Sequence, residues 1–395
     1  MTKYLFLLVL SITILMICLG GCEQKIISPK PQSDGINRLG DTSYVEISPP
    51  WGVPGSPSAL LIGNDQLMYV ADYENNQVHM MDAGGTILMS RNILHPMALA
   101  QNSKLDLYVC AEVINPKTLD TMGAIYRINL VRWDTVYIAG IKIDTLLHDT
   151  SYVYRDTSYF YNHNIADAHM RLIYSEPARP QRRFTGIGIL PRNGFLVART
   201  GTDNSSFVDP DTRVLRFKSN EEYETPVGDL VTRASGGTAI TDIRDLTGLM
   251  IFPSSNDFIL TQNSSQDAFG AIWMVYYETN DFIGWKPKYD PSISSQSGTD
   301  IVRPRRFLNA TAAAYDKRRR EIFILDSGLD SVVKFSITGQ FKSESFGKAN
   351  TAKNGLPALS HPSGIAYSND CTLYIADTGN KLIRRFRLST QLQCN

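Results

Sequence analysis

The sequence has no excess of charge, few cysteines and a single long hydrophobic run, and each shortage excludes a class of protein. Its 395 residues include 39 basic and 39 acidic side chains. Zero net charge argues against a nucleic-acid partner, because binding to a phosphate backbone favours a basic balance. With 43% hydrophobic and 20% charged residues, the composition is that of a globular protein with enough apolar side chains for a sizeable core.

The long hydrophobic run lies at the N-terminus, where Leu5 to Leu19 follow Lys3. It is short for a membrane-spanning helix, which needs about 20 apolar residues, and is typical of an export signal. It ends at Leu19-Gly20-Gly21-Cys22, which resembles the lipobox of bacterial lipoproteins. The resemblance implies that residues 1–21 are a signal peptide and that Cys22 becomes the lipid-modified first residue. The protein would then be anchored in the bacterial cell envelope, on the periplasmic face or the cell surface. The alternative is an ordinary secretory signal in which Cys22 is incidental.

The remaining cysteines are few enough to treat one by one. Cys110 lies among apolar residues and is predicted to be a buried thiol. Cys371 opens a predicted strand, and Cys394 follows the next strand along the chain. Since antiparallel strands place these two ends side by side, and export permits oxidation, a Cys371–Cys394 disulfide is predicted.

Residues 22–42 are polar and aperiodic, which predicts a flexible tether. After it, short β-rich runs recur between Gly, Asn, Asp and Pro residues, as in Ile365–Tyr367, Leu373–Ala376 and Ile383–Phe386. Each group of three or four runs predicts a small antiparallel sheet. Because one such sheet cannot bury both of its faces, the copies must pack on one another. Six copies begin at Pro57, His95, Thr185, Thr247, Thr311 and His361.

The repeats resemble NHL repeats, most clearly at Leu373–Asn380 and Met68–Asp72. Six such repeats imply an all-β fold, a six-bladed β-propeller over residues 43–395. The last copy lacks a fourth strand, so Tyr44–Ile47 is expected to supply it and to close the ring. In the fifth copy, Gly339–Phe341 is expected to be the fourth strand.

Residues 131–183 do not follow the repeat and are predicted to be a β-rich insertion in blade two. Tyr152, Tyr154, Tyr159 and Tyr161 lie within it. These tyrosines form either a contact surface, since tyrosine is common at recognition sites, or a hairpin packed on its own propeller.

The loops that lead into the blades hold the candidate site residues. His95 and His361 both precede a proline; they are candidate ligand-binding residues, and the alternative is that they are turn residues. A metal usually needs roughly three or four ligands, and no third histidine stands at an equivalent position. Related propellers include lactonases and lyases with one calcium or zinc in the central channel, but here only Asn309 is a candidate ligand. We therefore expect no cofactor, with a channel metal as the alternative.

Two arginine-rich strings precede blades three and five. They contain Arg179, Arg182 and Arg183 in one loop, and Arg303, Arg305 and Arg306 in the other. Arginine suits carboxylate and phosphate ligands, so the strings are a candidate site for an anionic ligand or an acidic protein loop. The alternative is loop charge paired with Asp167, Glu176 or Asp300.

Asp72, Asp326 and Asp377 recur at the end of the second strand and are expected to bind backbone amides of the following turn. No catalytic residue is predicted. Taken together, the sequence predicts a membrane-anchored lipoprotein whose propeller binds a protein, peptide or glycan of the cell envelope. The alternative is a metal-dependent hydrolase or lyase that uses the central channel.

Overall fold

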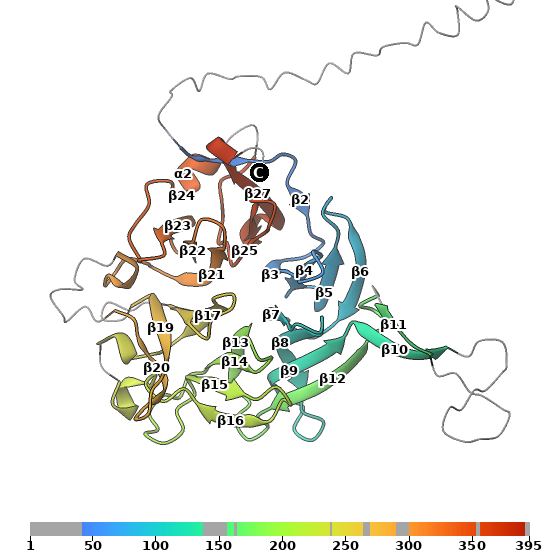
Figure 1. Ribbon diagram of the computed structural model, residues 1–395, viewed down its shortest axis with the longest axis vertical. Helices are drawn as coiled ribbons and strands as arrows, with labels where there is room; N and C mark the ends of the chain where they lie inside the picture. The colour runs from blue at the N-terminus through green and yellow to red at the C-terminus, as the bar shows by residue number, and fades with distance from the viewer. Residues whose placement is uncertain are drawn as a thin grey trace, which may run out of the picture. The chain divides into compact units, whose positions relative to one another are not determined.

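The strands form six antiparallel sheets that follow one another around a central axis (Figure 1). The computed structural model describes residues 42–136, 156–161, 164–237, 239–263, 269–289, 300–352 and 356–391. The first strands of the six sheets contact one another in a ring. The protein is therefore an all-β, six-bladed propeller, as the sequence predicts.

In each blade the strands pair from the centre outward. Blade one holds β3 (Pro57–Ile62), β4 (Met68–Asp72), β5 (Gln77–Met81) and β6 (Ile87–Asn92). Blade two holds β7 (Ala98–Gln101), β8 (Leu107–Ile114), β9 (Thr121–Asn129) and β12 (His169–Ser175). Blade three holds β13 (Arg183–Ile189), β14 (Phe195–Thr200), β15 (Arg213–Phe217) and β16 (Tyr223–Pro226). Blade four holds β17 (Leu246–Ile251), β18 (Phe258–Gln262), β19 (Ala271–Glu278) and β20 (Ile283–Pro287). Blade five holds β21 (Ala310–Asp316), β22 (Glu321–Asp326), β23 (Ser331–Ser336) and β24 (Phe346–Gly347). Blade six holds β25 (Gly364–Tyr367), β26 (Leu373–Asp377), β27 (Leu382–Leu388) and β1 (Tyr44–Glu46).

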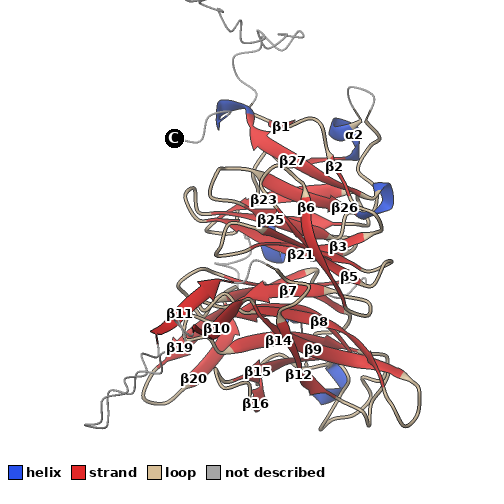
Figure 2. Ribbon diagram, turned by 90° about the vertical axis from the view of Figure 1, so that its right-hand side faces the viewer, coloured by secondary structure: helices blue, strands red, loops and turns tan. Residues whose placement is uncertain are grey.

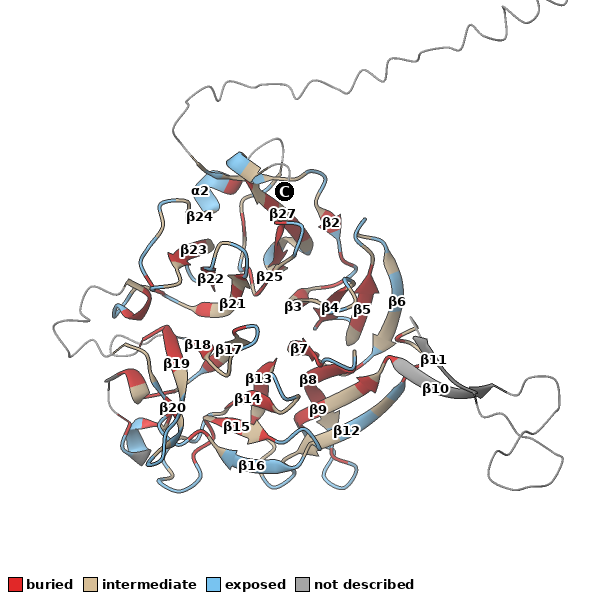
Figure 3. Cartoon of the chain, in the orientation of Figure 1, coloured by how far each residue is buried: buried red, intermediate tan, exposed pale blue. Residues whose placement is uncertain are grey.

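The core lies between the blades and is built mainly from their second strands. Every residue of β4, β18, β22 and β26 is buried, whereas the outer strand β16 is mostly exposed (Figure 3). The second strands are apolar on both faces because each face packs against a neighbouring blade. This double burial explains why they read as continuous apolar runs rather than alternating ones.

Blade six is completed by the N-terminal strand, which confirms the predicted closure of the ring. β1 pairs antiparallel with β27, and the short β2 (Trp51–Gly52) pairs with the same strand (Figure 2). Glu46 accepts two hydrogen bonds from the fully buried Arg384, at 2.7 and 2.5 Å. Tyr44 stacks on Phe346 of blade five with ring centroids 5.3 Å apart. The first described strand is therefore held by the last two blades.

The insertion in blade two lies between the third and fourth strands. β10 (Val131–Val136) and β11 (Asp156–Tyr161) form a separate two-stranded antiparallel sheet. The fourth strand of the blade, β12, comes from within the predicted insertion and pairs with β9. Tyr152 and Tyr154 lie outside the described residues, so the role predicted for the tyrosines is not tested.

One strand lies elsewhere than predicted. The expected fourth strand of blade five, Gly339–Phe341, is wrong, because Gly339 has φ of 76° and forms a turn. After this turn Phe341 makes only an isolated bridge to Phe335, and the strand that pairs with β23 is β24. The helical segments of the described chain are short, as in α2 (Lys348–Thr351), and none has the length and apolarity to cross a membrane.

The cysteines follow their predicted environments as far as the structure describes them. Cys110 is a free, fully buried thiol, and burial raises its pKa. Cys371 is disulfide-bonded. Because Cys394 lies outside the described residues, the Cys371–Cys394 pairing stays a prediction.

The antiparallel strand order gives the propeller two faces with different sets of loops. Loops that lead into the first strand of a blade, and loops that join its second and third strands, emerge on one face, which we call the upper face. The other loops emerge on the lower face. Because the β10–β11 insertion joins a third to a fourth strand, it starts and ends at the lower face.

Candidate functional site

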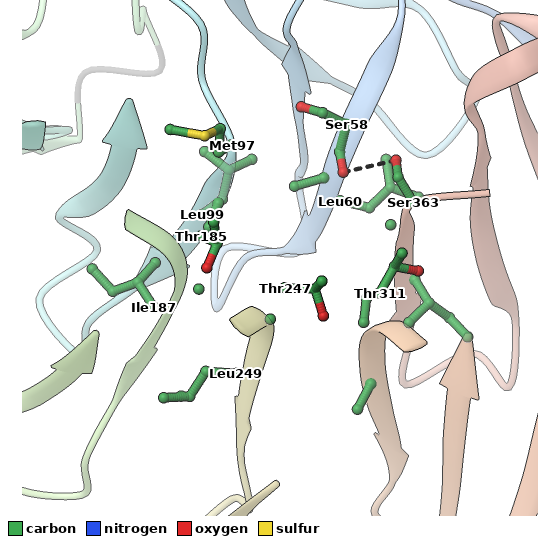
Figure 4. A pocket seen from close by; sticks show the side chains of 18 residues that line it. Ser58, Leu60, Met97, Leu99, Thr185, Ile187, Thr247, Leu249, Thr311 and Ser363 are labelled. Carbon is green, nitrogen blue, oxygen red and sulfur yellow. Dashed lines mark hydrogen bonds between the residues drawn. The ribbon is translucent and has the colours of Figure 1, made fainter. Parts of the chain in front are cut away.

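A channel along the propeller axis is narrow near the upper face and wide near the lower face. Its upper part, about 100 Å³, is lined at the start of the six first strands by Ser58, Met97, Thr185, Thr247, Thr311 and Ser363 (Figure 4). The next residue in every blade is Gly or Ala. A Cβ at Gly186 would lie only 2.6 Å from the backbone nitrogen of Leu249, so the strands approach too closely for a larger side chain. The lower part, about 750 Å³, shares Leu60, Leu99, Ile187, Leu249, Ala313 and Ile365 with the upper part.

The hydroxyl groups of the upper part are already used to join the blades. Each donates to the backbone carbonyl that precedes the equivalent residue of the next blade. These bonds run from Ser58 to Pro96 (2.8 Å), Thr185 to Leu246 (2.6 Å), Thr247 to Ala310 (2.5 Å), Thr311 to Pro362 (3.3 Å) and Ser363 to Pro57 (3.1 Å). The ring is interrupted in blade two, where Met97 has no hydroxyl group. We therefore assign these side chains to the fold rather than to catalysis.

The channel does not fit the calcium or zinc ion of the alternative prediction. No Asp, Glu, His or Cys residue lines either part. In the described part of the chain, no group of three or more such residues could hold a metal. Asn309, the one predicted ligand, instead donates its side-chain amide to the hydroxyl of Ser327 at 2.8 Å, and its backbone N–H to Asp326 at 3.0 Å.

His95 and His361 occupy equivalent turns at the upper face. Both have a left-handed backbone, with φ of 42° and 46°. The backbone N–H of His95 donates to the side chain of Asn76 at 3.0 Å, and that of His361 donates to Asp330 at 2.6 Å. In each case the acceptor belongs to the preceding blade. These contacts are those of turn residues. His95 and His361 lead into different blades and have separate partners.

The imidazole of His95 also joins a network that spans blades one to three. Its Nδ1 lies 2.7 Å from the carboxylate of Glu112, and its ring stacks on Tyr73 with centroids 4.5 Å apart. The other carboxylate oxygen of Glu112 accepts a hydrogen bond from Arg183. Arg183 donates further to the backbone carbonyl of Thr121 at 3.5 Å. Sequence reasoning missed Glu112, whose partners lie 17 and 71 residues away along the chain.

The first arginine string builds a second network in blade three. Arg182 is only 4% exposed and donates to three carboxylates, Glu176 (2.7 Å), Asp209 (2.7 Å) and Asp211 (2.8 Å). Burial lowers the pKa of Arg182, but the hydrogen bonds to these carboxylates outweigh burial and raise it. Arg199 shares two of the same acids, at 2.7 Å from Glu176 and 3.1 Å from Asp209. The charge of Arg182 is thus neutralised inside the protein.

The remaining string residues are closer to solvent. Arg179 lies 3.8 Å from Asp203, and its side chain is 43% exposed. Arg303 and Arg306 both pair with Asp300, at 3.5 and 3.3 Å, while Arg305 is exposed. Two of the acids suggested as partners, Glu176 and Asp300, do pair with the strings, whereas Asp167 bonds Asn164. The two strings pair with different acids: Arg183 of the first string reaches Glu112 in blade two, and Arg306 of the second pairs with Asp300 beside its own string. The anionic-ligand hypothesis is left with the more exposed residues Arg179, Arg303 and Arg305.

The recurring aspartates fasten the upper loops, and Asp326 and Asp72 accept from amides of the following turn as predicted. Asp326 accepts from the amide of Gly328, two residues on, at 3.0 Å, and also from Leu308 in the loop that leads into the blade, at 2.8 Å. Asp72 accepts in the same way from Ser56, and Asp377 from Ser360. All three aspartates are fully buried.

Asp72 is also linked to a serine through a buried histidine. His79 lies with Nε2 3.2 Å from Asp72 and Nδ1 2.7 Å from the hydroxyl of Ser90. The three residue types are those of a hydrolytic triad, but His79 is only 1% exposed. None of the three lines either part of the channel. The three residues therefore form a buried polar link between strands β4, β5 and β6 of blade one.

The most exposed apolar side chains of the described chain lie on loops of the upper face. The three most exposed large hydrophobic residues of the described chain are Val208 (77%), Leu119 (76%) and Phe207 (71%), all in loops that join second and third strands. Others on this face are Tyr73, Ile114, Leu308 and Leu329. The two arginine networks hold several of these loops. Arg182 and Arg199 bind Asp209, the residue that follows Val208, and Arg213 donates to the Val208 carbonyl at 2.6 Å.

No protein-family model and no curated protein matches the sequence. Solved structures do match. An auxiliary nutrient binding protein from Bacteroides thetaiotaomicron has a TM-score of 0.52 and 10% identity over 85% of this chain and 70% of its own. A putative gluconolactonase has a TM-score of 0.51 and 9% identity over 89% and 93%. A gluconolactonase from Xanthomonas campestris has a TM-score of 0.50 and 11% identity over 89% and 91%. At such low identity these likenesses show the propeller fold.

Proposed function

We propose that the protein is a lipid-anchored binding platform of the bacterial cell envelope whose upper face holds a protein partner. The anchor rests on the lipobox-like Leu19-Gly20-Gly21-Cys22, and the platform on the NHL-like repeats. Several acyl chains on Cys22 would hold the protein stably at a membrane, where a single chain would be marginal. The polar residues 22–42 would let the propeller reach a partner beyond the membrane surface.

The observation that carries the proposal is the exposure of Leu119, Phe207 and Val208 on the upper loops. Single apolar side chains are normal on a protein surface, whereas adjacent, highly exposed ones such as Phe207 and Val208 are typical of interaction sites. The networks around Arg182 and Glu112 hold the loops in place, which lowers the entropy lost on binding. The nutrient-binding neighbour is a propeller that binds a ligand, which is in keeping with a binding role. The channel wall, by contrast, offers no donor set for the metal-dependent alternative.

Photo-crosslinking in cells tests this proposal. A photoreactive amino acid replaces Phe207, and in a matched control it replaces Ile283 on the outer strand β20, which is 65% exposed. Both positions are open to solvent, so neither change should disturb the fold. We expect a discrete crosslinked species from position 207 and none from position 283, and we expect Cys22→Ser to move the protein out of the membrane fraction. The same products from both positions, or none from position 207, would contradict a partner on the upper face.

A further inference from the structure

The wide lower part of the channel is a second candidate site, on the face opposite the proposed partner surface. All six blades contribute to its wall, among others through Leu61, Gln101, Ile189, Ile251, Tyr315 and Tyr367. Its volume of about 750 Å³ lies within the range of small-molecule sites, roughly 300–1,000 Å³. We call it the lower bowl.

The lining of the lower bowl is uncharged and mainly apolar, with polar side chains such as Asn64, Ser103 and Asn193 toward the lower loops. None of its residues is Asp, Glu, Lys, Arg or His. Leu61, Ile189 and Ile251 are only partly buried, so their side chains meet water when the bowl is empty. Covering such surface is favourable for an apolar ligand. A charged ligand would instead lose its hydration here without gaining an ion pair.

The bowl is preformed, because bonds between the lower loops hold its rim. The buried side chain of Gln101 in blade two accepts from the backbone N–H of Asn64 in blade one at 2.6 Å and donates to Asp65 at 3.1 Å. On the next interface, the Asn193 side chain of blade three accepts from the hydroxyl of Ser103 at 3.0 Å. These bonds fix three neighbouring blades relative to one another.

Packed aromatic rings hold the opposite side of the bowl. Tyr315 meets Phe252 edge-on with centroids 5.0 Å apart, and Tyr367 stacks on Phe323 at 5.5 Å. Rigid walls reduce the ordering cost of binding.

The channel narrows at the inner end of the bowl. The upper part of the channel is only about 100 Å³ and is ringed by the hydroxyl groups that join the blades. A ligand that fills the bowl would therefore enter and leave through the wider, lower face. Binding there leaves the upper loops free.

We propose that the lower bowl binds a neutral, mainly hydrocarbon small molecule. The size of the bowl fits a small molecule, and its uncharged, mainly apolar lining favours such a ligand over an anionic metabolite. The inference does not depend on the proposed function, since the two sites lie on opposite faces and share no residue.

A pair of fluorescent probes tests the proposal on the full chain. N-phenyl-1-naphthylamine is neutral, and 1-anilinonaphthalene-8-sulfonate presents nearly the same rings with a negative charge. We expect saturable binding of the neutral probe and at least about tenfold weaker binding of the sulfonate, because the bowl offers no counter-charge. Equal affinities, or no saturable binding of the neutral probe, would overturn the proposal.

Matched variants locate the binding. Ile251→Asp places a charge in the bowl wall, whereas Leu88→Asp places one on the exposed outer strand β6. Neutral-probe affinity should fall about tenfold or more in Ile251→Asp and stay unchanged in Leu88→Asp. Leu61→Trp fills part of the bowl from strand β3 without adding charge and should weaken binding too, which keeps the test valid if Ile251→Asp is unstable. Unchanged binding in both bowl variants would show that the probe binds elsewhere, for example to lipid at Cys22. It would refute the lower bowl as the binding site.

Discussion

At the scale of single residues, a charged side chain in this protein can have a structural role where its sequence context predicts a binding role. Arg182 follows Pro180 in a loop that also holds Arg179 and Arg183, a context typical of solvated or ligand-binding charge. In the fold it is buried beneath Glu176, Asp209 and Asp211. Two of these acids lie 27 and 29 residues downstream, in a loop without periodicity. No local sequence pattern could predict the contacts of Arg182 with Asp209 and Asp211.

Loss of Arg182 should therefore damage the fold rather than a binding surface. Arg182→Met leaves three carboxylates with only Arg199 to balance them, and breaking a buried ion pair costs about 3–5 kcal/mol. Arg303→Met is the matched control in the other string, where the side chain is 59% exposed; its free energy of unfolding should change by no more than about 0.5 kcal/mol. Urea unfolding of both variants measures the difference. Equal stability in the two variants would show that the carboxylate cluster does not depend on Arg182.

At the scale of elements, the start of each first strand acts as a joint between neighbouring blades. Ser58, Thr185, Thr247 and Thr311 each lie in a register shift of the first strand, so they are left out of the ladder of their own blade. A β-bulge of this kind redirects a side chain. Here the hydroxyl group reaches the next blade. The joint is missing where Met97 replaces the hydroxyl residue.

Completing this ring should stabilise the propeller. Met97→Thr can donate to the carbonyl of Phe184, the counterpart of the acceptors in the other blades, whereas Met97→Val has the same shape without the hydroxyl. A net hydrogen bond contributes about 0.5–1.5 kcal/mol, so the threonine variant should exceed the valine variant in free energy of unfolding by that amount. Thr247→Val should lose a similar amount relative to the unmodified chain. Thermal or urea unfolding of the three variants measures these differences in free energy of unfolding. Identical stabilities for Met97→Thr and Met97→Val would refute a stabilising hydrogen bond between the blades at this position.

The elements themselves were largely predictable, because each rests on a local signal. Apolar second strands such as Leu373–Ala376 identify the small sheets by their residue types, and a terminal Asp marks copies one, five and six, where the resemblance to NHL repeats is clearest. The fourth strand of blade five was predicted at the wrong place, at the turn around Gly339, because β24 has only two residues and no distinctive sequence pattern. The lower bowl was missed for another reason. Residues such as Leu61 and Ile251 look like core positions in the sequence, and only closure of the ring shows that they face a cavity.

At the scale of the whole molecule, the propeller depends on a clasp between its two described ends. A ring of six blades has no covalent closure, so the last interface must hold against opening. β1 supplies that hold by pairing with β27 and by placing Glu46 against Arg384, which is 0% exposed and also lies 3.3 Å from Asp377. A second ion pair, Glu74–Lys381 at 2.8 Å, joins blades one and six at the surface.

The two ion pairs make a matched comparison of buried and exposed closure. Glu46→Ala leaves the Arg384 guanidinium buried with only Asp377 and backbone carbonyls as partners, so we expect a loss of about 3 kcal/mol or more. Glu74→Ala removes a pair whose side chains are 53% and 51% exposed, and it should cost at most about 1 kcal/mol. Hydrogen exchange should show faster exchange at the amides of β1 and β27 in Glu46→Ala than in Glu74→Ala, because the ring would open at this interface first. If protection falls uniformly over all six blades, the clasp contributes only to global stability, and opening does not begin where the ends of the ring meet.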